Sequence, residues 1–136
     1  MLSLSGRLIQ ERIGHDLGPL GLSYAQAAVL VRLWRHDGRM PQAAMIDSLA
    51  LSRAACTNLL NVLDQQGLTE RVPDPADARR MVVRLTEAGH DLERPVLDVF
   101  ERVEAEIGDS LGDEDAATAY RVVRAVLERL RQSRPR

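Results

Sequence analysis

The segment 40–85 constrains the fold more than any other part of the chain. Ser52 is a typical helix N-cap residue, and the apolar spacing after it predicts a helix that ends at Gly67. Pro41 can begin a shorter helix just upstream, because the first helical position needs no backbone N–H. Two short runs of strand-forming residues follow, on either side of a proline-bearing loop. The segment therefore predicts two closely joined helices followed at once by a hairpin.

The rest of the chain has the spacing of further helices. Pro95 is expected to kink the helix expected at residues 86–107 near Asp91, and Gly108 is expected to end that helix. Ser23 with Gln26 three residues later forms a capping-box pattern. We expect these helices at residues 4–17, 23–36, 86–107 and 113–132, the last with apolar positions Ala116, Ala119, Tyr120, Val123, Val126, Leu127 and Leu130. The expected fold is mainly α with a small β-hairpin wing, a winged helix-turn-helix with additional N- and C-terminal helices.

Length and charge restrict the function. The 136 residues suit one domain, and all 18 basic residues are arginines, set against 20 acidic residues, for a net charge of −2. A uniformly basic coat for nucleic acid is therefore excluded, and any attraction to phosphate must come from local patches. With one cysteine, Cys56, and three separated histidines, we expect no disulfide, metal or cofactor. With no apolar run long enough for a signal peptide or membrane span, we expect a cytoplasmic chain and no membrane partner.

The second helix of the segment has two faces of different chemistry. Cys56, Leu59, Leu60 and Leu63 recur at the spacing of a buried face. The opposite face carries small or hydrogen-bonding side chains, which suit the DNA major groove. The residues predicted to contact DNA from this helix are Ser52, Arg53, Ala54, Thr57, Asn58 and Asn61.

The hairpin loop offers a second contact with DNA. Arg79 and Arg80 lie near its tip, where a projecting guanidinium can enter a minor groove or bind phosphate. Asp77 can orient the Arg79 guanidinium or tie down the loop. The alternative is that both arginines are solvated loop charges, but a preceding helix-turn-helix favours DNA contact.

These segments resemble the multiple-antibiotic-resistance regulators, the MarR family. Residues 21–30 are similar to the entry into the family's second helix, and residues 40–71 follow its helix-turn-helix. The most specific match is the wing signature at residues 74–89, DPADARRMVVRLTEAG, with Asp77 and Arg79 at its Asp-x-Arg positions. Three departures are Pro41 in place of a capping threonine, Ala50 in place of a turn glycine and Asn58 in place of an arginine.

The resemblance implies a homodimeric transcriptional regulator, a repressor that covers a palindromic operator on double-stranded DNA. Residues 1–136 would form a single domain, with residues 22–89 binding DNA and residues 1–20 and 90–136 forming the dimer. The stripe from Leu92 to Ile107 would then be dimer interface, although it could also be core within one chain. A protein-interaction module that has lost DNA binding is the alternative, supported by the acidic balance and Asn58. No catalytic arrangement is visible, so an enzyme is not expected.

Many members of the family release DNA when a small molecule binds between the dimerisation and DNA-binding regions. Arg12, His15 and Trp34 are the residues predicted to bind such an effector, a small aromatic or anionic molecule. The alternative is that Trp34 belongs to the core and the histidines lie on the surface. Cys56 is interpreted as a small core residue rather than a redox sensor.

Overall fold

The structure is a computed structural model that describes residues 2–112, 114–115, 117–118 and 121–122. The chain divides into two compact units, Met1–Val99 and Phe100–Arg136. The described parts of the predicted last helix are helical, and the seven apolar positions named for it lie outside the described residues. No helix in the described ranges is both long and apolar enough to cross a membrane.

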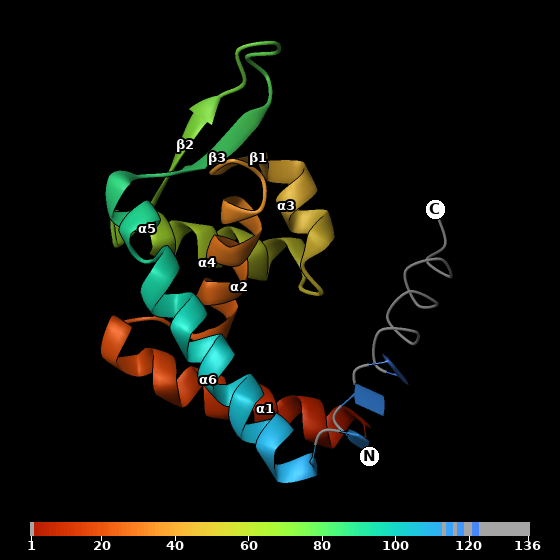
Figure 1. The fold of residues 1–136 in the computed structure, drawn as a ribbon. Helices are drawn as coiled ribbons and strands as arrows, with labels where there is room; N and C mark the ends of the chain where they lie inside the picture. Colours follow the sequence, from red (N-terminus) through yellow and green to blue (C-terminus); the bar gives the residue numbers. More distant parts are fainter. Residues whose placement is uncertain (1, 113, 116, 119–120, 123–136) are drawn as a thin grey trace. The chain divides into compact units, whose positions relative to one another are not determined.

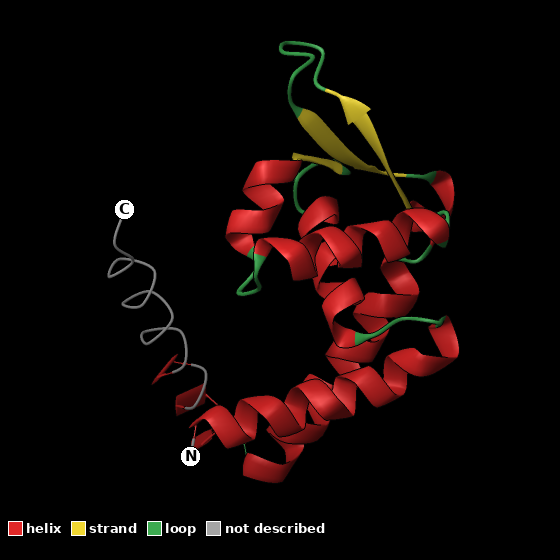
Figure 2. Ribbon diagram, turned by 180° about the vertical axis from the view of Figure 1, so that it is seen from behind, coloured by secondary structure: helices red, strands yellow, loops and turns green. Residues whose placement is uncertain are grey.

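The described elements confirm a mainly helical fold with a small antiparallel sheet (Figure 1). A 3-10 turn, Gly18–Leu20, joins the first two helices. In chain order, the elements are α1 (Leu2–Leu17), α2 (Tyr24–Trp34), β1 (Arg39–Pro41), α3 (Gln42–Ser48), α4 (Arg53–Gln65), β2 (Thr69–Pro73), β3 (Met81–Leu85), α5 (Glu87–Asp91) and α6 (Glu93–Leu111). In the first unit, the strands lie at one end and β2 and β3 project as the wing (Figure 2).

The predicted capping box at the start of α2 is present. The Ser23 hydroxyl accepts the Gln26 backbone N–H at 3.2 Å, and the Gln26 carbonyl oxygen Oε1 accepts the Ser23 N–H at 2.7 Å. Gln26 is buried and donates from Nε2 to Oε1 of Gln66 at 2.8 Å. This bond ties the start of α2 to the end of α4, so the cap also fixes how the two helices pack.

The sheet has three strands, in the order β1-β3-β2, where the sequence predicted only two. Arg39 pairs with Arg84, and the N–H of Leu85 donates to the carbonyl of Gly38 at 2.8 Å. β1 is three residues long and ends in a proline, so it shows no alternating pattern by which it could be recognised. It is a strand only because β3, more than 40 residues later, supplies its partner.

The predicted kinked helix after Thr86 is two helices. α5 ends at Asp91 and α6 begins at Glu93, so the helix is interrupted where a kink was predicted. Pro95 lies in the first turn of α6, where the missing N–H has no helical partner to lose. The prediction that Gly108 ends the helix is wrong, because α6 continues to Leu111.

The long apolar stripes are buried only in part. On α1, Ile13 and Leu17 are buried, whereas the side chains of Leu8 and Ile9 are 54% and 39% exposed. On α6, Val96 and Val99 are buried within the single chain. The interpretation of the whole 92–107 stripe as dimer interface is therefore wrong for these two valines, because the chain itself covers them.

Candidate nucleic-acid interface

Helix α4 presents the two faces that its spacing predicted. Ser52 caps it, with its hydroxyl accepting the Ala55 N–H at 3.1 Å. Cys56, Leu60 and Leu63 are fully buried and anchor the helix on the core, whereas Leu59, also predicted for this face, is half-buried. The opposite face is thereby left in solvent, starting at the N-terminus of the helix.

Two side chains on the outer face of α4 are free to bind. Arg53 and Asn58 are exposed, and within the described part of the chain neither side chain makes a hydrogen bond or ion pair. Ala54 is exposed between them and adds no bulk. Thr57 differs, because its hydroxyl donates to the carbonyl of Arg53 at 2.9 Å. The face thus combines an unpaired cation, a free amide and a threonine whose donor is used within the helix.

Asn61, also predicted to contact DNA, belongs to a hydrogen-bonded cluster between α4 and the wing. Its Oδ1 accepts from Arg71 Nη2 at 2.5 Å, and Arg71 Nε lies 2.7 Å from Asp64 Oδ2. The other carboxylate oxygen of Asp64 accepts the Thr69 hydroxyl at 2.6 Å. The Arg71 and Asp64 side chains are 26% and 22% exposed, so their attraction is screened less than that of a surface pair. This clamp, Asn61, Asp64, Thr69 and Arg71, fixes strand β2 against helix α4.

The wing loop is closed by its own two aspartates. Asp74 donates its N–H to the carbonyl of Arg80 at 2.8 Å, and its carboxylate accepts the Ala76 N–H at 2.9 Å. The Asp77 carboxylate accepts the Arg79 N–H at 3.1 Å. Each aspartate therefore satisfies the backbone two residues further on, the usual behaviour of aspartate in turns.

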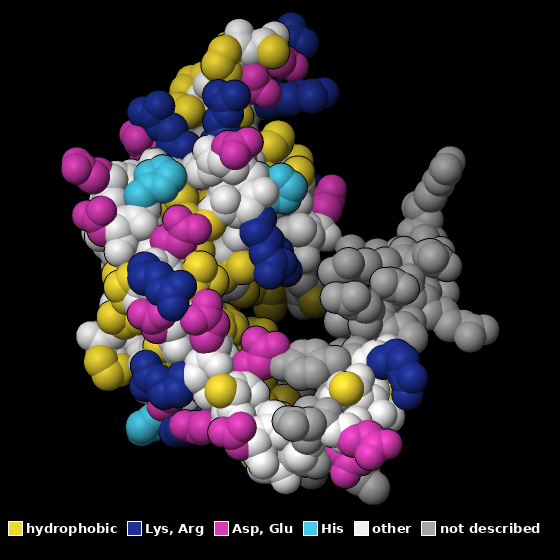
Figure 3. All heavy atoms as spheres, in the orientation of Figure 1, with side chains coloured by type: hydrophobic (Ala, Val, Ile, Leu, Met, Phe, Trp, Pro, Cys, Tyr) yellow, Lys and Arg dark blue, Asp and Glu magenta, His cyan; other side chains and the backbone are white. Residues whose placement is uncertain are grey.

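The two arginines of the wing loop are not equivalent. Arg80 Nε lies 3.5 Å from Asp77 Oδ2, whereas the Arg79 side chain has no ion pair among the described residues. Asp77 thus faces the guanidinium of Arg80 and only the backbone of Arg79. Arginine side chains gather over the wing and sheet in the space-filling view (Figure 3). Arg79 is the one that the loop leaves available.

The backbones of Gly89 and Leu68 approach each other closely at the base of the wing. A Cβ at Gly89 would be 2.2 Å from the carbonyl oxygen of Leu68, so this position requires glycine. The Gly89 carbonyl accepts the indole N–H of Trp34 at 3.2 Å, and the Gly89 N–H donates to the Thr86 hydroxyl. Sequence reasoning missed this role. The only signal was a glycine three residues after a capping threonine.

The three predicted effector residues do not form one site. Arg12 and His15 are exposed on α1, and both lie beside the Asp16 carboxylate, at 3.1 and 3.2 Å. Gly14 between them lies beside Tyr24 at the start of α2. Trp34 lies ten residues after Tyr24 on α2, which is about 15 Å along the helix axis at 1.5 Å per residue. Among the residues with described positions, no His, Cys, Asp and Glu group could hold a metal ion.

Comparisons with known proteins agree with this geometry. A model of the MarR family matches residues 20–80. The organic hydroperoxide resistance transcriptional regulator of Bacillus subtilis (strain 168) is 29% identical over 73% of this chain and 67% of its own length. Among solved structures, a MarR transcriptional regulator from Methanosarcina mazei Go1 has a TM-score of 0.85 at 24% identity, covering 96% of this chain and 87% of that one. A mutant MarR from E. coli complexed with operator DNA has a TM-score of 0.81 at 24% identity, covering 93% and 90%.

Proposed function

The chain belongs to the MarR family of winged-helix transcriptional regulators, and on that premise we propose that it is a repressor that binds a palindromic operator as a homodimer. Residues 22–89 are the proposed DNA-binding region. Helix α4 would enter the major groove, and the wing would reach the adjacent minor groove. A DNA-binding regulator acts where the chromosome lies, so we place it in the cytoplasm.

One observation carries this proposal. Arg53 and Asn58 on α4 and Arg79 on the wing lack partners within the described structure, while the clamp joins the two elements that carry them. Free donors on α4 and on the wing, held in a fixed arrangement, suit a ligand that contacts both elements at the same time. A fold neighbour, the mutant MarR from E. coli, is complexed with operator DNA, which supports the proposal that this framework binds DNA.

The dimer is proposed to form through residues 1–20 and 90–136. Leu8 and Ile9 on α1 and Ile107 on α6 are large apolar side chains that the single chain leaves exposed. Covering them with a second copy would remove this surface from water. Two copies related by a twofold axis would meet half-sites about one helical turn apart, roughly 34–36 Å.

The remaining predicted contacts fit this docking. Ser52 and Ala54 lie at the N-terminus of α4, where backbone N–H groups favour phosphate. Asn61 keeps its amide N–H groups as donors, because Arg71 occupies its oxygen. Arg80 is a weaker contact than Arg79, because Asp77 already faces it. We also propose that a small aromatic or anionic effector releases the DNA, with Trp34 and the Arg12–His15 pair as two separate candidate contacts.

The test is operator selection from random duplexes with purified protein at modest salt. We expect an enriched palindrome, and we expect Asn58→Ala to lose preference at one base pair per half-site, at about 1–3 kcal/mol each. The matched control is Gln65→Ala, which removes an exposed amide at the far end of the same helix and should bind as the unmodified protein does. Recovery of no palindrome by the folded dimer would overturn the proposal in favour of a protein-interaction module.

A further inference from the structure

A pocket of about 710 Å³ lies on the outer face of the sheet, and we call it the outer-sheet pocket. Val83 and Leu85 of β3 are buried, so the alternate positions Val82 and Arg84 face outward. The strand register places Arg39 beside Arg84, and it places Pro41 and Val72 on either side of Val82. The outer face thus has one charged row and one apolar row, and both line the pocket.

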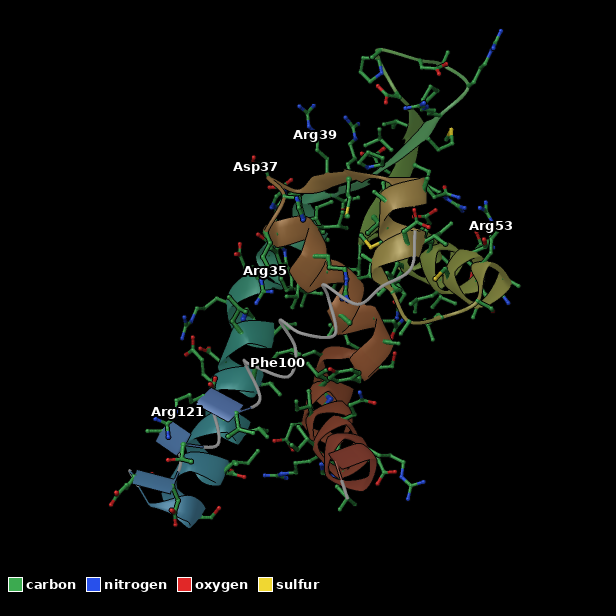
Figure 4. The ribbon with its side chains drawn as sticks, turned by 90° about the vertical axis from the view of Figure 1, so that its right-hand side faces the viewer. Arg35, Asp37, Arg39, Arg53, Phe100 and Arg121 are labelled. Carbon is green, nitrogen blue, oxygen red and sulfur yellow. The ribbon has the colours of Figure 1, made fainter. Side chains whose placement is uncertain are left out.

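The turn between α2 and β1 forms one wall of the pocket. Asp37 and Gly38 both have left-handed backbones, with φ of 55° and 76°. Gly38 is fixed from both sides, since its N–H donates to Leu33 and its carbonyl accepts from Leu85, both at 2.8 Å. The reversal brings Arg35 and Arg39 to the same side of the first unit, opposite Arg53 (Figure 4).

The charges on the pocket are only partly compensated. Arg84 pairs with Glu70 at 2.7 Å, but the guanidinium groups of Arg35 and Arg39 make no ion pair or hydrogen bond to any described residue. In the apolar row, Pro41 is exposed and Val72 and Val82 are half-buried. Two free guanidinium groups beside an apolar floor are complementary to an anionic head on an apolar body.

We propose that the outer-sheet pocket binds a small organic carboxylate, with its head on Arg35 and Arg39 and its apolar body on the Pro41–Val82–Val72 row. A monoanion fits better than a dianion, because Asp37 and Asp74 also line the pocket. The apolar residues of the lining are aliphatic, so the body need not be aromatic. The volume lies within the roughly 300–1,000 Å³ of small-molecule sites. Arg53 faces the opposite side, so the ligand would lie away from the α4 part of the proposed operator surface. It would lie next to the wing part, because Asp74 and Ala76 of the wing loop line the pocket.

The experiment is an NMR titration of the full-length, isotope-labelled protein with cyclohexanecarboxylate. We expect saturable shifts of the backbone amides of residues 35–37, 39–40, 72, 74, 76 and 82–84. The indole N–H of Trp34, the only tryptophan, should not move. Cyclohexanecarboxamide, which has the same shape but no charge, should bind about tenfold more weakly, as expected for loss of a charged hydrogen bond. Acetate, which lacks the apolar body, should also bind more weakly.

Variants connect these shifts to the named residues. Arg35→Gln and Arg39→Gln should each lower the affinity about tenfold. The matched control is Arg102→Gln, which removes an exposed arginine of α6 and should leave it unchanged. Amide spectra of the variants without ligand establish that they are folded. The proposal is overturned if the carboxylate gives no saturable shifts, if the shifts centre on Trp34, or if both glutamine variants bind it as the control does. None of these results depends on DNA.

Discussion

The two ends of the wing are built in opposite ways. At the base, the Thr86 hydroxyl and N–H donate to the carbonyls of Gly67 and Leu68, and the clamp fixes β2 to α4. At the tip, the loop bonds only to itself and leaves the Arg79 guanidinium free. The base therefore fixes where the wing stands, and the tip supplies the charge. Mutations at the base should reduce stability, and mutations at the tip should change DNA binding with little effect on stability.

The largest effect is expected for Gly89→Ala. Its new Cβ would lie 2.2 Å from the Leu68 carbonyl oxygen, which is held in place by the Thr86 N–H. We expect a loss of about 3 kcal/mol in the free energy of unfolding, measured by denaturant titration. Gly108→Ala is the control, because open space surrounds that helical position and alanine should stabilise it by about 0.5–1 kcal/mol. Equal stability of the two variants would disprove the close approach at Gly89.

Asp64→Ala should have the next largest effect. It leaves a half-buried Arg71 without its carboxylate and Thr69 without its acceptor, at an expected cost of about 2 kcal/mol in unfolding free energy. Glu70→Ala breaks the exposed Glu70–Arg84 pair of the same sheet and should cost less than about 0.5 kcal/mol. If both variants unfold at the same denaturant concentration, the clamp is no stronger than a surface ion pair.

At the tip, Arg79→Ala should leave stability unchanged and weaken binding to all duplexes. Each phosphate contact contributes about 0.9 to the slope of log affinity against log salt, so a dimer that loses two should lose about 1.8. Arg80→Ala should change the slope less, because Asp77 already faces that guanidinium. Fluorescence anisotropy across a salt series measures both slopes. A larger change for Arg80 than for Arg79 would reverse the assignment of the two arginines.

Asp77→Asn should have the smallest effect. The amide keeps an oxygen to accept the Arg79 N–H but loses its attraction for Arg80. We expect unfolding free energy to change by less than about 0.5 kcal/mol and duplex affinity at low salt to rise, since Arg80 is released. A stability loss as large as that of Asp64→Ala would mean that the tip is as structural as the base.

Local signals in the sequence predicted much of the fold. Ser23, Ser52 and Thr86 cap helices as their residue types indicate, and the buried face of α4 follows its apolar spacing. β1 was missed because its identity depends on a partner distant in sequence. Gly108 was misjudged because a glycine within a helix only lowers stability, and the rest of α6 outweighs that cost.

The candidate site shows the same division. The outward positions of Arg53 and Asn58 follow from helical spacing alone. The pairing of Asn61 with Arg71 and the contact of Gly89 with Leu68 depend on how a strand and two helices meet. Such contacts join residues of different elements, so the spacing within one element does not reveal them.

The internal hydrogen bond of Thr57 affects what α4 can distinguish. With its hydroxyl hydrogen used on the Arg53 carbonyl, the side chain can meet a base edge through its methyl group. In the major groove, the apolar partner for a methyl group is the C5-methyl of thymine. A cytosine methylated at C5 presents the same group at the same place. At that contact, the proposed complex would accept a methylated C·G pair in place of T·A, and epigenetic marking of an operator would then alter its occupancy.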